Sequence, residues 1–344
     1  MSNSIWNLLN DLSKKNGITE ILINGPKSVF VERGGEFIQL NANIPASDIK
    51  LFIKEVADMN HKHCDNDNPI MDGNLPDGSR INIINEPFVN GSPAISIRKY
   101  LKFISSFENN PTVFGLTPHW IDFLKAIMAA RLNVVVSGGT GVGKTTFLNL
   151  MVNEISKQER VIAIEDTPEL SINMPNVVRL ESGAKAMQSK SALSTRDLVK
   201  NTLRMRPDRI IIGETRGGEL FDLLQAMNTG HDGSMTSVHA SSGGECLSRM
   251  ETLFLLSGVE IPLNVVRRQM SSAIQFIIQL GRDKDGNRVI NEIVELCGME
   301  GNTMLIQPIA VREEGFLEFK GIVPKNMEKL NRIGGLPLNF FENM

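Results

Sequence analysis

Residues 138–145 read GGTGVGKT, and this stretch constrains the fold of the chain more than any other. It satisfies the pattern GxxxxGK[ST], in which glycines let backbone N–H groups turn inward around a phosphate. An apolar β-branched run at residues 133–136 precedes it, and a segment with a helical pattern follows it. A buried strand, a glycine-rich loop and a helix N-terminus in this order are typical of a phosphate-binding loop. A chance glycine-rich turn would not carry both flanking patterns.

Three further apolar runs follow this loop, at residues 161–164, 209–212 and 234–238, and helical segments separate them. Such runs are too apolar to have one face in water, which is typical of a parallel sheet covered on both sides. We therefore predict a doubly wound α/β domain over residues 119–344. The composition between residues 105 and 118 shifts to Ser, Asn, Gly and two prolines, which predicts a linker.

Residues 1–104 read as a smaller mixed α/β domain with short alternating strands. Two alternating runs flank Gly34 and Gly35, which accept the positive φ of a tight hairpin turn. Residues 80–84 and 94–98 are predicted to be strands of the same sheet, with an arginine at one end of each. Cap signals predict helices from Ser47 to about Asn60, from Ser194 or Thr195 to about Arg206, and from Gly218 to Asn228.

The composition limits the possible classes of protein. The 344 residues include 36 Lys+Arg and 39 Asp+Glu, and a net charge of −3 gives no electrostatic reason to expect direct nucleic-acid binding. Three scattered cysteines, Cys64, Cys246 and Cys297, form neither a disulfide framework nor a paired CxxC zinc site, which favours a reducing compartment. The basic start of a secretory signal is missing, and no apolar stretch approaches the ~18 residues of a membrane span. We expect a cytoplasmic chain.

Acidic residues follow two of the predicted parallel strands. Glu165 and Asp166 come directly after one strand, and Glu214 follows another after a single glycine. The carboxyl ends of parallel strands open on the same edge, where the phosphate-binding loop also lies. We expect Glu214 to contact Mg²⁺ or its water shell, and Glu165 to orient or deprotonate an attacking water. The two roles can also be assigned in the opposite way.

Two histidines, His231 and His239, lie eight residues apart at opposite ends of a predicted strand, which argues against a shared metal ion. His239 is expected to respond to a γ-phosphate and to relay hydrolysis to neighbouring elements. Lys144 is expected to reach the β and γ phosphates and Thr145 to hold Mg²⁺. The residues assigned to nucleotide binding are Gly138, Gly139, Thr140, Gly141, Val142, Gly143, Lys144, Thr145, Thr146 and His231.

Four stretches in order resemble the Walker A, Asp box, Walker B and His box of the secretion-ATPase superfamily of type II and type IV secretion and type IV pili. They are residues 138–145, 164–166, 203–218 and 226–234. Within this superfamily the chain is most similar to the CpaF/TadA branch, the motors of tight-adherence (Flp) pili. Stretches that support this closer resemblance are residues 19–26, 75–82, 95–99 and 298–301.

The resemblance implies an α/β fold, with a RecA-like P-loop ATPase domain that has a parallel sheet, preceded by a small mixed α/β, PAS-like N-terminal domain. It also implies ATP and Mg²⁺ as cofactors and a homo-hexameric ring. Arg80 and Arg98 would contact the phosphates, as arginine fingers do. Arg204, Arg206 and Arg216 are expected in subunit interfaces or structural ion pairs.

The expected function is that of an Mg²⁺-dependent ATP hydrolase whose ring powers assembly of a Tad/Flp-type (type IV) pilus, with retraction as a second use of the same ring. Its partners would be inner-membrane platform proteins, which would hold it at the cytoplasmic face of the inner membrane. One alternative is a type IV secretion or conjugation ATPase that powers substrate export. Another is a nucleotide-gated interaction protein with little turnover.

Overall fold

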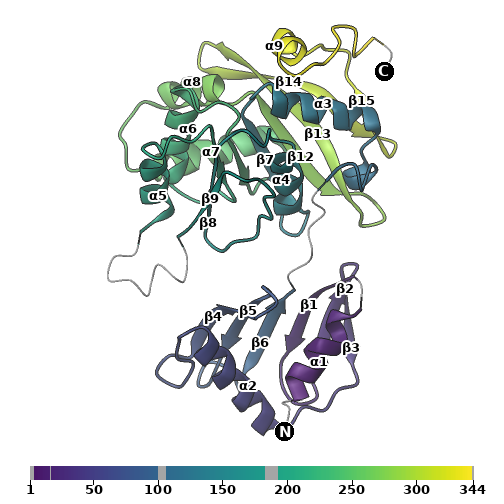
Figure 1. Cartoon of the computed structure of the whole chain (residues 1–344), viewed down its shortest axis with the longest axis vertical. Helices are drawn as coiled ribbons and strands as arrows, with labels where there is room; N and C mark the ends of the chain where they lie inside the picture. Colours follow the sequence, from purple (N-terminus) through teal and green to yellow (C-terminus); the bar gives the residue numbers. More distant parts are fainter. Residues whose placement is uncertain (1–3, 16, 100–105, 183–192, 343–344) are drawn as a thin grey trace. The chain divides into compact units, whose positions relative to one another are not determined.

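The computed structural model divides the chain into two compact units, Met1–Lys102 and Phe103–Met344 (Figure 1). It describes residues 4–15, 17–99, 106–182 and 193–342. Each unit has its own sheet, and the described residues form one hydrophobic core in the N-terminal unit and two in the C-terminal unit. In the described ranges, no helix is long and apolar enough to cross a membrane.

The N-terminal unit is an antiparallel sheet with the strand order β3-β2-β1-β6-β5-β4 over its described residues. Two helices pack with the sheet, and the rings of Trp6 and Phe52, one from each helix, meet at 4.8 Å. The elements are α1 (Ser4–Ser13), β1 (Ile18–Ile23), β2 (Val29–Arg33), β3 (Glu36–Leu40), α2 (Ala46–Met59), β4 (Ile70–Asn74), β5 (Arg80–Ile84) and β6 (Ala94–Arg98).

The sequence predicted a hairpin turn and a helix cap in this unit, and the structure has the first but not the second. The hairpin between β2 and β3 is confirmed, and Gly34 and Gly35 have φ values of 65° and 91°. The cap predicted at Ser47 is wrong, because α2 begins one residue earlier, after Pro45. The Oγ of Ser47 contacts only the neighbouring Asp48 among the described hydrogen bonds, at 3.5 Å. Proline fixes its own φ and so places the start of the helix without a side-chain cap.

The C-terminal unit contains a larger sheet with the order β15-β14-β13-β12-β7-β11-β10-β8-β9 over its described residues. From β12 to β9 all neighbouring strands are parallel, and an antiparallel meander of β13, β14 and β15 extends the sheet. The strands are β7 (Val134–Gly138), β8 (Val161–Glu165), β9 (Val177–Glu181), β10 (Arg209–Ile212), β11 (Met235–Val238), β12 (Phe276–Arg282), β13 (Arg288–Glu300), β14 (Thr303–Glu313) and β15 (Phe316–Phe319).

Helices cover both faces of this sheet, as the apolar runs predicted (Figure 1). In β7, Val134 and Val136 lie in one core and Val135 lies in the other, so each face of the strand is buried. Helices α3 (Pro118–Ala129), α4 (Lys144–Asn153) and α9 (Met327–Arg332) contribute to the first core. Helices α5 (Thr195–Thr202), α6 (Glu219–Asn228), α7 (Gly243–Leu255) and α8 (Leu263–Ala273) contribute to the second.

Ser194 caps α5 through a reciprocal capping box with Asp197. Of the two predicted alternatives, Ser194 and Thr195, Ser194 is therefore the cap. The helix ends at Thr202 rather than near Arg206. Arg206 has a φ of 53° and precedes a proline, and the residue before proline is disfavoured in helical conformation. The predicted helix over residues 218–228 corresponds to α6.

Residues 106–117, which the composition predicted to be part of a linker, are instead packed into the C-terminal unit. Phe107, Phe114 and Leu116 are buried in the core of the C-terminal unit. Residues Val113–Gly115 form a 3₁₀ turn, and the hydroxyl of Thr117 caps α3. Large apolar side chains therefore anchor a stretch whose prolines and small residues suggested a solvated connection.

Candidate active site

The glycine-rich loop joins β7 to α4, as predicted. Gly141 and Gly143 have φ values of 73° and 96°, a conformation that favours glycine. A Cβ on Gly143 would meet Arg288 and Phe114 at 3.0 and 3.1 Å, whereas one on Gly139 would have no neighbour within 4 Å. Gly143 is also the N-cap of α4 and has no side chain to occupy the first N–H groups of the helix. The loop thus leaves backbone donors at a helix N-terminus, where anions bind favourably.

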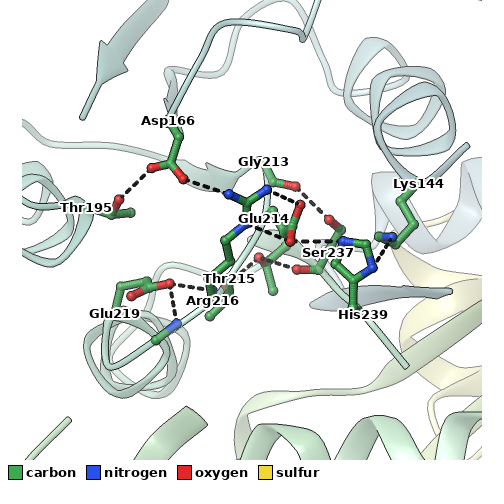
Figure 2. A network of polar contacts seen from close by, with 12 residues as sticks. Lys144, Asp166, Thr195, Gly213, Glu214, Thr215, Arg216, Glu219, Ser237 and His239 are labelled. Atoms are coloured by element: carbon green, nitrogen blue, oxygen red, sulfur yellow. Dashed lines mark hydrogen bonds and ion pairs between the residues drawn. The ribbon is translucent and has the colours of Figure 1, made fainter. Parts of the chain in front are cut away.

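Lys144, the first residue of α4, is only 8% exposed. Its Nζ donates to the carbonyl oxygens of Gly138 and Gly139 at 3.0 and 2.9 Å. The same nitrogen lies 3.1 Å from Nδ1 of His239 (Figure 2). The ammonium group is therefore folded back over its own loop and onto the residue that follows β11.

His239 connects this lysine to the end of β10. An ammonium group can only donate, so Nδ1 accepts from Lys144 and the proton of the neutral ring lies on Nε2. Nε2 is 3.1 Å from Oε1 of Glu214 and donates to it (Figure 2). Burial lowers the pKa of His239, the charge of Lys144 lowers it further, and Glu214 opposes both effects. The imidazole is thus a neutral bridge between a cation and an anion.

Glu214 follows β10 after Gly213, and its carboxylate has partners on both oxygens. Arg216 donates from Nε to Oε1 at 2.8 Å and from Nη2 to Oε2 at 3.1 Å. Burial alone would raise the pKa of Glu214, but the hydrogen bond and charge of Arg216 outweigh it and the pKa is lowered. The side chain is therefore an ionised carboxylate at neutral pH.

Asp166 ends the row of polar contacts at the edge of the sheet. Its Oδ2 lies 3.5 Å from Nη1 of Arg216, and its Oδ1 accepts from the hydroxyls of Ser182 and Thr195 at 2.7 and 3.2 Å. The contacts run from Lys144 through His239, Glu214 and Arg216 to Asp166 (Figure 2).

Glu165, the last residue of β8, is buried beside β10. Its Oε1 accepts from the backbone N–H groups of Glu169 and Leu170 at 2.9 and 3.0 Å. Burial raises the pKa of Glu165, although these two hydrogen bonds lower it. A Cβ on Gly213 would lie 3.1 Å from Cγ of Glu165, so a side chain before Glu214 would crowd this carboxylate. A carboxylate with a raised pKa is a better proton acceptor, and here it also holds the loop that follows β8.

Residues 6–308 match the family described as "Type II/IV secretion system protein". The chain belongs to this family. It is 31% identical over 306 residues to a putative conjugal transfer protein of Mycobacterium tuberculosis, with 87% of this chain and 86% of the relative covered. It is 30% identical to the conjugal transfer protein TrbB of Rhizobium radiobacter (86% and 89% covered) and to the type IV secretion system protein VirB11 of Bartonella henselae (78% and 86%).

Solved structures share the fold of this secretion ATPase. The Legionella pneumophila ATPase DotB aligns with a TM-score of 0.63 at 20% identity, covering 84% of this chain and 80% of DotB. The pilus retraction motor PilT with bound ADP aligns with a TM-score of 0.60 at 19% identity, covering 96% and 87%. These similarities confirm the expected fold class, and family membership confirms the expected superfamily and an ATPase.

Within this chain the structure does not bring His231 to the phosphate-binding loop, which differs from its assignment to nucleotide binding. His231 precedes β11 and its Nδ1 lies 3.2 Å from the carbonyl oxygen of Ala226 at the end of α6. Because β11 and β7 are parallel, His231 lies at the edge of the sheet opposite Lys144. A glycine-rich sequence around a histidine does not by itself indicate which end of a strand carries the site.

The arginines that were assigned roles from the sequence of the secretion ATPase lie in different environments. Arg80 and Arg98 are register partners on β5 and β6 of the N-terminal unit, with Arg80 half-buried and Arg98 exposed. Arg204 and Arg206 are exposed after α5. Arg216 forms ion pairs, as one of its expected roles, but its partners Glu214 and Asp166 were not predicted. The sequence signal that could have indicated Asp166 as a partner is its position directly after Glu165, at the end of β8.

The oxygen ligands at this edge fit a magnesium ion only together with a nucleotide. Among the residues that the structure describes, no three His, Cys, Asp or Glu side chains are grouped to hold a metal ion. Mg²⁺ at nucleotide sites takes one or two protein ligands and completes its shell with phosphate oxygens and water. The hydroxyl of Thr145 and the carboxylate of Glu214 are ligands of the right chemistry for that arrangement.

Proposed function

We propose that this secretion ATPase hydrolyses ATP in an Mg²⁺-dependent cycle and works as a ring of six identical subunits. The observation that carries the catalytic part is the row of contacts from Lys144 through His239 to Glu214, which joins the phosphate-binding loop to a carboxylate on another strand. The ring rests on the family resemblance described above. Arg80 and Arg98 are proposed to contact phosphate on the same resemblance.

In the proposed cycle, phosphate oxygens replace the carbonyl oxygens of Gly138 and Gly139 as acceptors for Lys144. The exchange is favourable because a charged acceptor forms stronger hydrogen bonds with an ammonium group than a carbonyl does. We propose that this exchange also moves the ammonium group away from Nδ1 of His239, so that the state of the loop affects the residue that contacts Glu214. A bound Mg²⁺ would neutralise charge on the phosphates, and Thr145 and Glu214 would hold it. Glu165 is proposed to orient the attacking water.

The first candidate for the driven process is assembly of a Tad/Flp-type pilus, with the ATPase docked by inner-membrane platform proteins at the cytoplasmic face. The supporting observations are the stretches of the sequence that resemble the CpaF/TadA branch. A second candidate is export of DNA or protein by a conjugation or type IV secretion machine. The names of the curated relatives, TrbB and VirB11 among them, favour this second candidate.

Phosphate release by the purified full-length chain tests the catalytic proposal. Wild type should release phosphate in an Mg²⁺-dependent manner, and Lys144→Ala should abolish it. Lys200→Ala, on the exposed side of α5, serves as the matched control and should keep the wild-type rate. Tight ATP binding without turnover would contradict the motor proposal and favour a nucleotide-gated interaction protein.

A deletion strain separates the two driven processes. Loss of surface pili with unchanged transfer of DNA or protein would support the pilus motor. Loss of transfer with unchanged pili would support the export ATPase. A salt-sensitive DNA affinity of the purified chain would also favour export, because phosphate contacts release counterions.

A further inference from the structure

Both oxygens of the Glu214 carboxylate have protein partners. Oε1 accepts from Nε of Arg216 and from Nε2 of His239, at 2.8 and 3.1 Å, and Oε2 accepts from Nη2 of Arg216 at 3.1 Å. A cation that binds at Glu214 must therefore compete with the guanidinium group for the same two oxygens. The competition is electrostatic, because a divalent cation and an arginine repel each other at short distance.

The backbone next to Arg216 is fixed although its side chain is exposed. The N–H groups of Arg216 and Gly217 both donate to Oε1 of Glu219, at 2.6 and 2.9 Å, at the start of α6. The side chain of Arg216 is 63% exposed. The guanidinium group can therefore change its partner through side-chain rotation while the loop stays in place.

A second carboxylate lies within reach of the same guanidinium group. Oδ2 of Asp166 is 3.5 Å from Nη1 of Arg216, longer than a good charged hydrogen bond of roughly 2.7–2.9 Å. Asp166 is held from its other side, because Oδ1 accepts from Ser182 and Thr195 and these two hydroxyls lie 2.8 Å apart. It is thus a fixed acceptor that a small movement of Arg216 would engage fully.

We propose that Arg216 is a positioning residue that alternates between two carboxylates. It pairs with Glu214 when no divalent cation is bound, and it transfers to Asp166 when a cation occupies Glu214. Arg216 keeps an ionic partner in both states. Because a cation must displace its guanidinium group from Glu214, the affinity of the site for a cation is lowered. This inference rests on the proposed role of Glu214 toward Mg²⁺.

Binding of Mn²⁺ to the full chain in the presence of ADP, followed by electron paramagnetic resonance, tests the inference without turnover. Arg216→Ala should bind Mn²⁺ at least about fivefold more tightly than wild type, a modest coupling between two sites. Arg216→Lys keeps the charge but loses the planar fork that engages both oxygens of Glu214, so it should also bind Mn²⁺ more tightly. If Arg216→Lys binds Mn²⁺ as wild type does while Arg216→Ala binds it more tightly, the positive charge alone, and not the two-point pairing with Glu214, lowers the affinity. That result would overturn the proposal.

Asp166→Asn provides the second half of the test. The alternation predicts weaker Mn²⁺ binding in this variant, because Arg216 loses its second ionic partner and stays on Glu214. The same substitution in an Arg216→Ala background should have a smaller effect, since there is no guanidinium group left to transfer and only the loss of a negative charge remains. An equal loss in both backgrounds would overturn the proposal, because simple loss of a negative charge acts in either background.

Two controls separate this inference from the proposed function. Arg267 donates to Glu251 with the same two-point geometry, at 2.7 and 3.2 Å between α7 and α8, and Arg267→Ala should leave Mn²⁺ binding unchanged. Glu214→Gln should weaken Mn²⁺ binding. If it does not, the proposed role of Glu214 fails and the inference fails with it. If it does, but neither Arg216 variant binds Mn²⁺ more tightly, only the alternation of Arg216 is overturned.

Discussion

Nζ of Lys144 lies 3.1 Å from Nδ1 of His239, although 95 residues separate them in the chain. The other nitrogen of the same imidazole donates to Glu214 at the end of a third strand. One neutral ring thus joins the phosphate-binding loop to the carboxylate proposed to act on Mg²⁺. A phosphate that draws the ammonium group of Lys144 away from Nδ1 would alter the hydrogen bonds of this ring, which gives the site a physical means to respond to phosphate.

Substitution of Glu214 should separate ATP binding from turnover. Glu214→Ala should reduce kcat by about 100-fold or more, as for loss of a positioned catalytic group. ATP affinity should change much less, because Lys144 and the N-terminus of α4 are retained. Isothermal titration and phosphate release measure the two quantities. Glu251→Ala, which removes another arginine-paired glutamate, should leave kcat unchanged, and turnover by Glu214→Ala at the wild-type rate would contradict the assignment.

The capping box of α5 should contribute measurably to stability. Asp197 N–H donates to Oγ of Ser194 at 3.2 Å and the Ser194 N–H donates to Asp197 Oδ2 at 3.0 Å. Ser194→Ala should lower the free energy of unfolding of the C-terminal unit by about 1 kcal/mol. Urea unfolding measures it, with Ser47→Ala as the matched control. Ser47→Ala should alter the free energy of unfolding by no more than about 0.5 kcal/mol, because Ser47 is not a cap. Equal effects of the two substitutions would contradict this account of the caps.

His119 should make the stability of the C-terminal unit depend on pH. Its ring stacks on Phe340 with centroids 3.7 Å apart, and burial lowers its pKa below the ordinary value of 6.5, opposed by Asp122 and the backbone of Phe340. The unfolded chain then binds more protons than the folded one, so the contribution is present above pH 6.5 and is lost as the pH falls through the lower folded pKa.

His119→Phe keeps a ring on Phe340 but cannot titrate. Its melting temperature should therefore fall less steeply than that of wild type between pH 7.5 and pH 5. Thermal unfolding followed by circular dichroism across this range measures the difference. Identical slopes for the two proteins would contradict the protonation argument for His119.

Cys246 should be chemically inert in the folded protein. It is buried in α7, and burial raises its pKa to about 12. At pH 8 only about one such thiol in ten thousand is ionised, and the thiolate is the reactive form. In a Cys64→Ser, Cys297→Ser variant, Ellman's reagent should therefore detect no thiol until urea unfolds the C-terminal unit. Rapid labelling of the folded variant would contradict the burial of Cys246.

Much of the C-terminal sheet was predictable because its central strands have no polar face. Val134, Val135 and Val136 are all buried, and only a strand covered on both sides accommodates such a run. The meander of β13 to β15 was not predictable in the same way. Irregular register between Ile293 and Val294, and again near Gly298, breaks the alternation that identifies a strand.

The two serines that were predicted as helix caps show how short local signals differ. Ser194 has Asp197 three residues later and forms a capping box, whereas Ser47 has Lys50 at that position and forms no cap. At the site, the motifs predicted which residue types reach the sheet edge but not which side chains pair there. The contact between Arg216 and Asp166 depends on β8 lying beside β10, which the strand order determines.

The central claim, a ring-forming ATP hydrolase, is tested most directly by mass in solution. Light scattering with and without ATP and Mg²⁺ gives the mass, while phosphate release is followed in the same sample. We predict a hexamer that releases phosphate and that loses this release in Lys144→Ala. A monomer that releases no phosphate under either condition would contradict the claim.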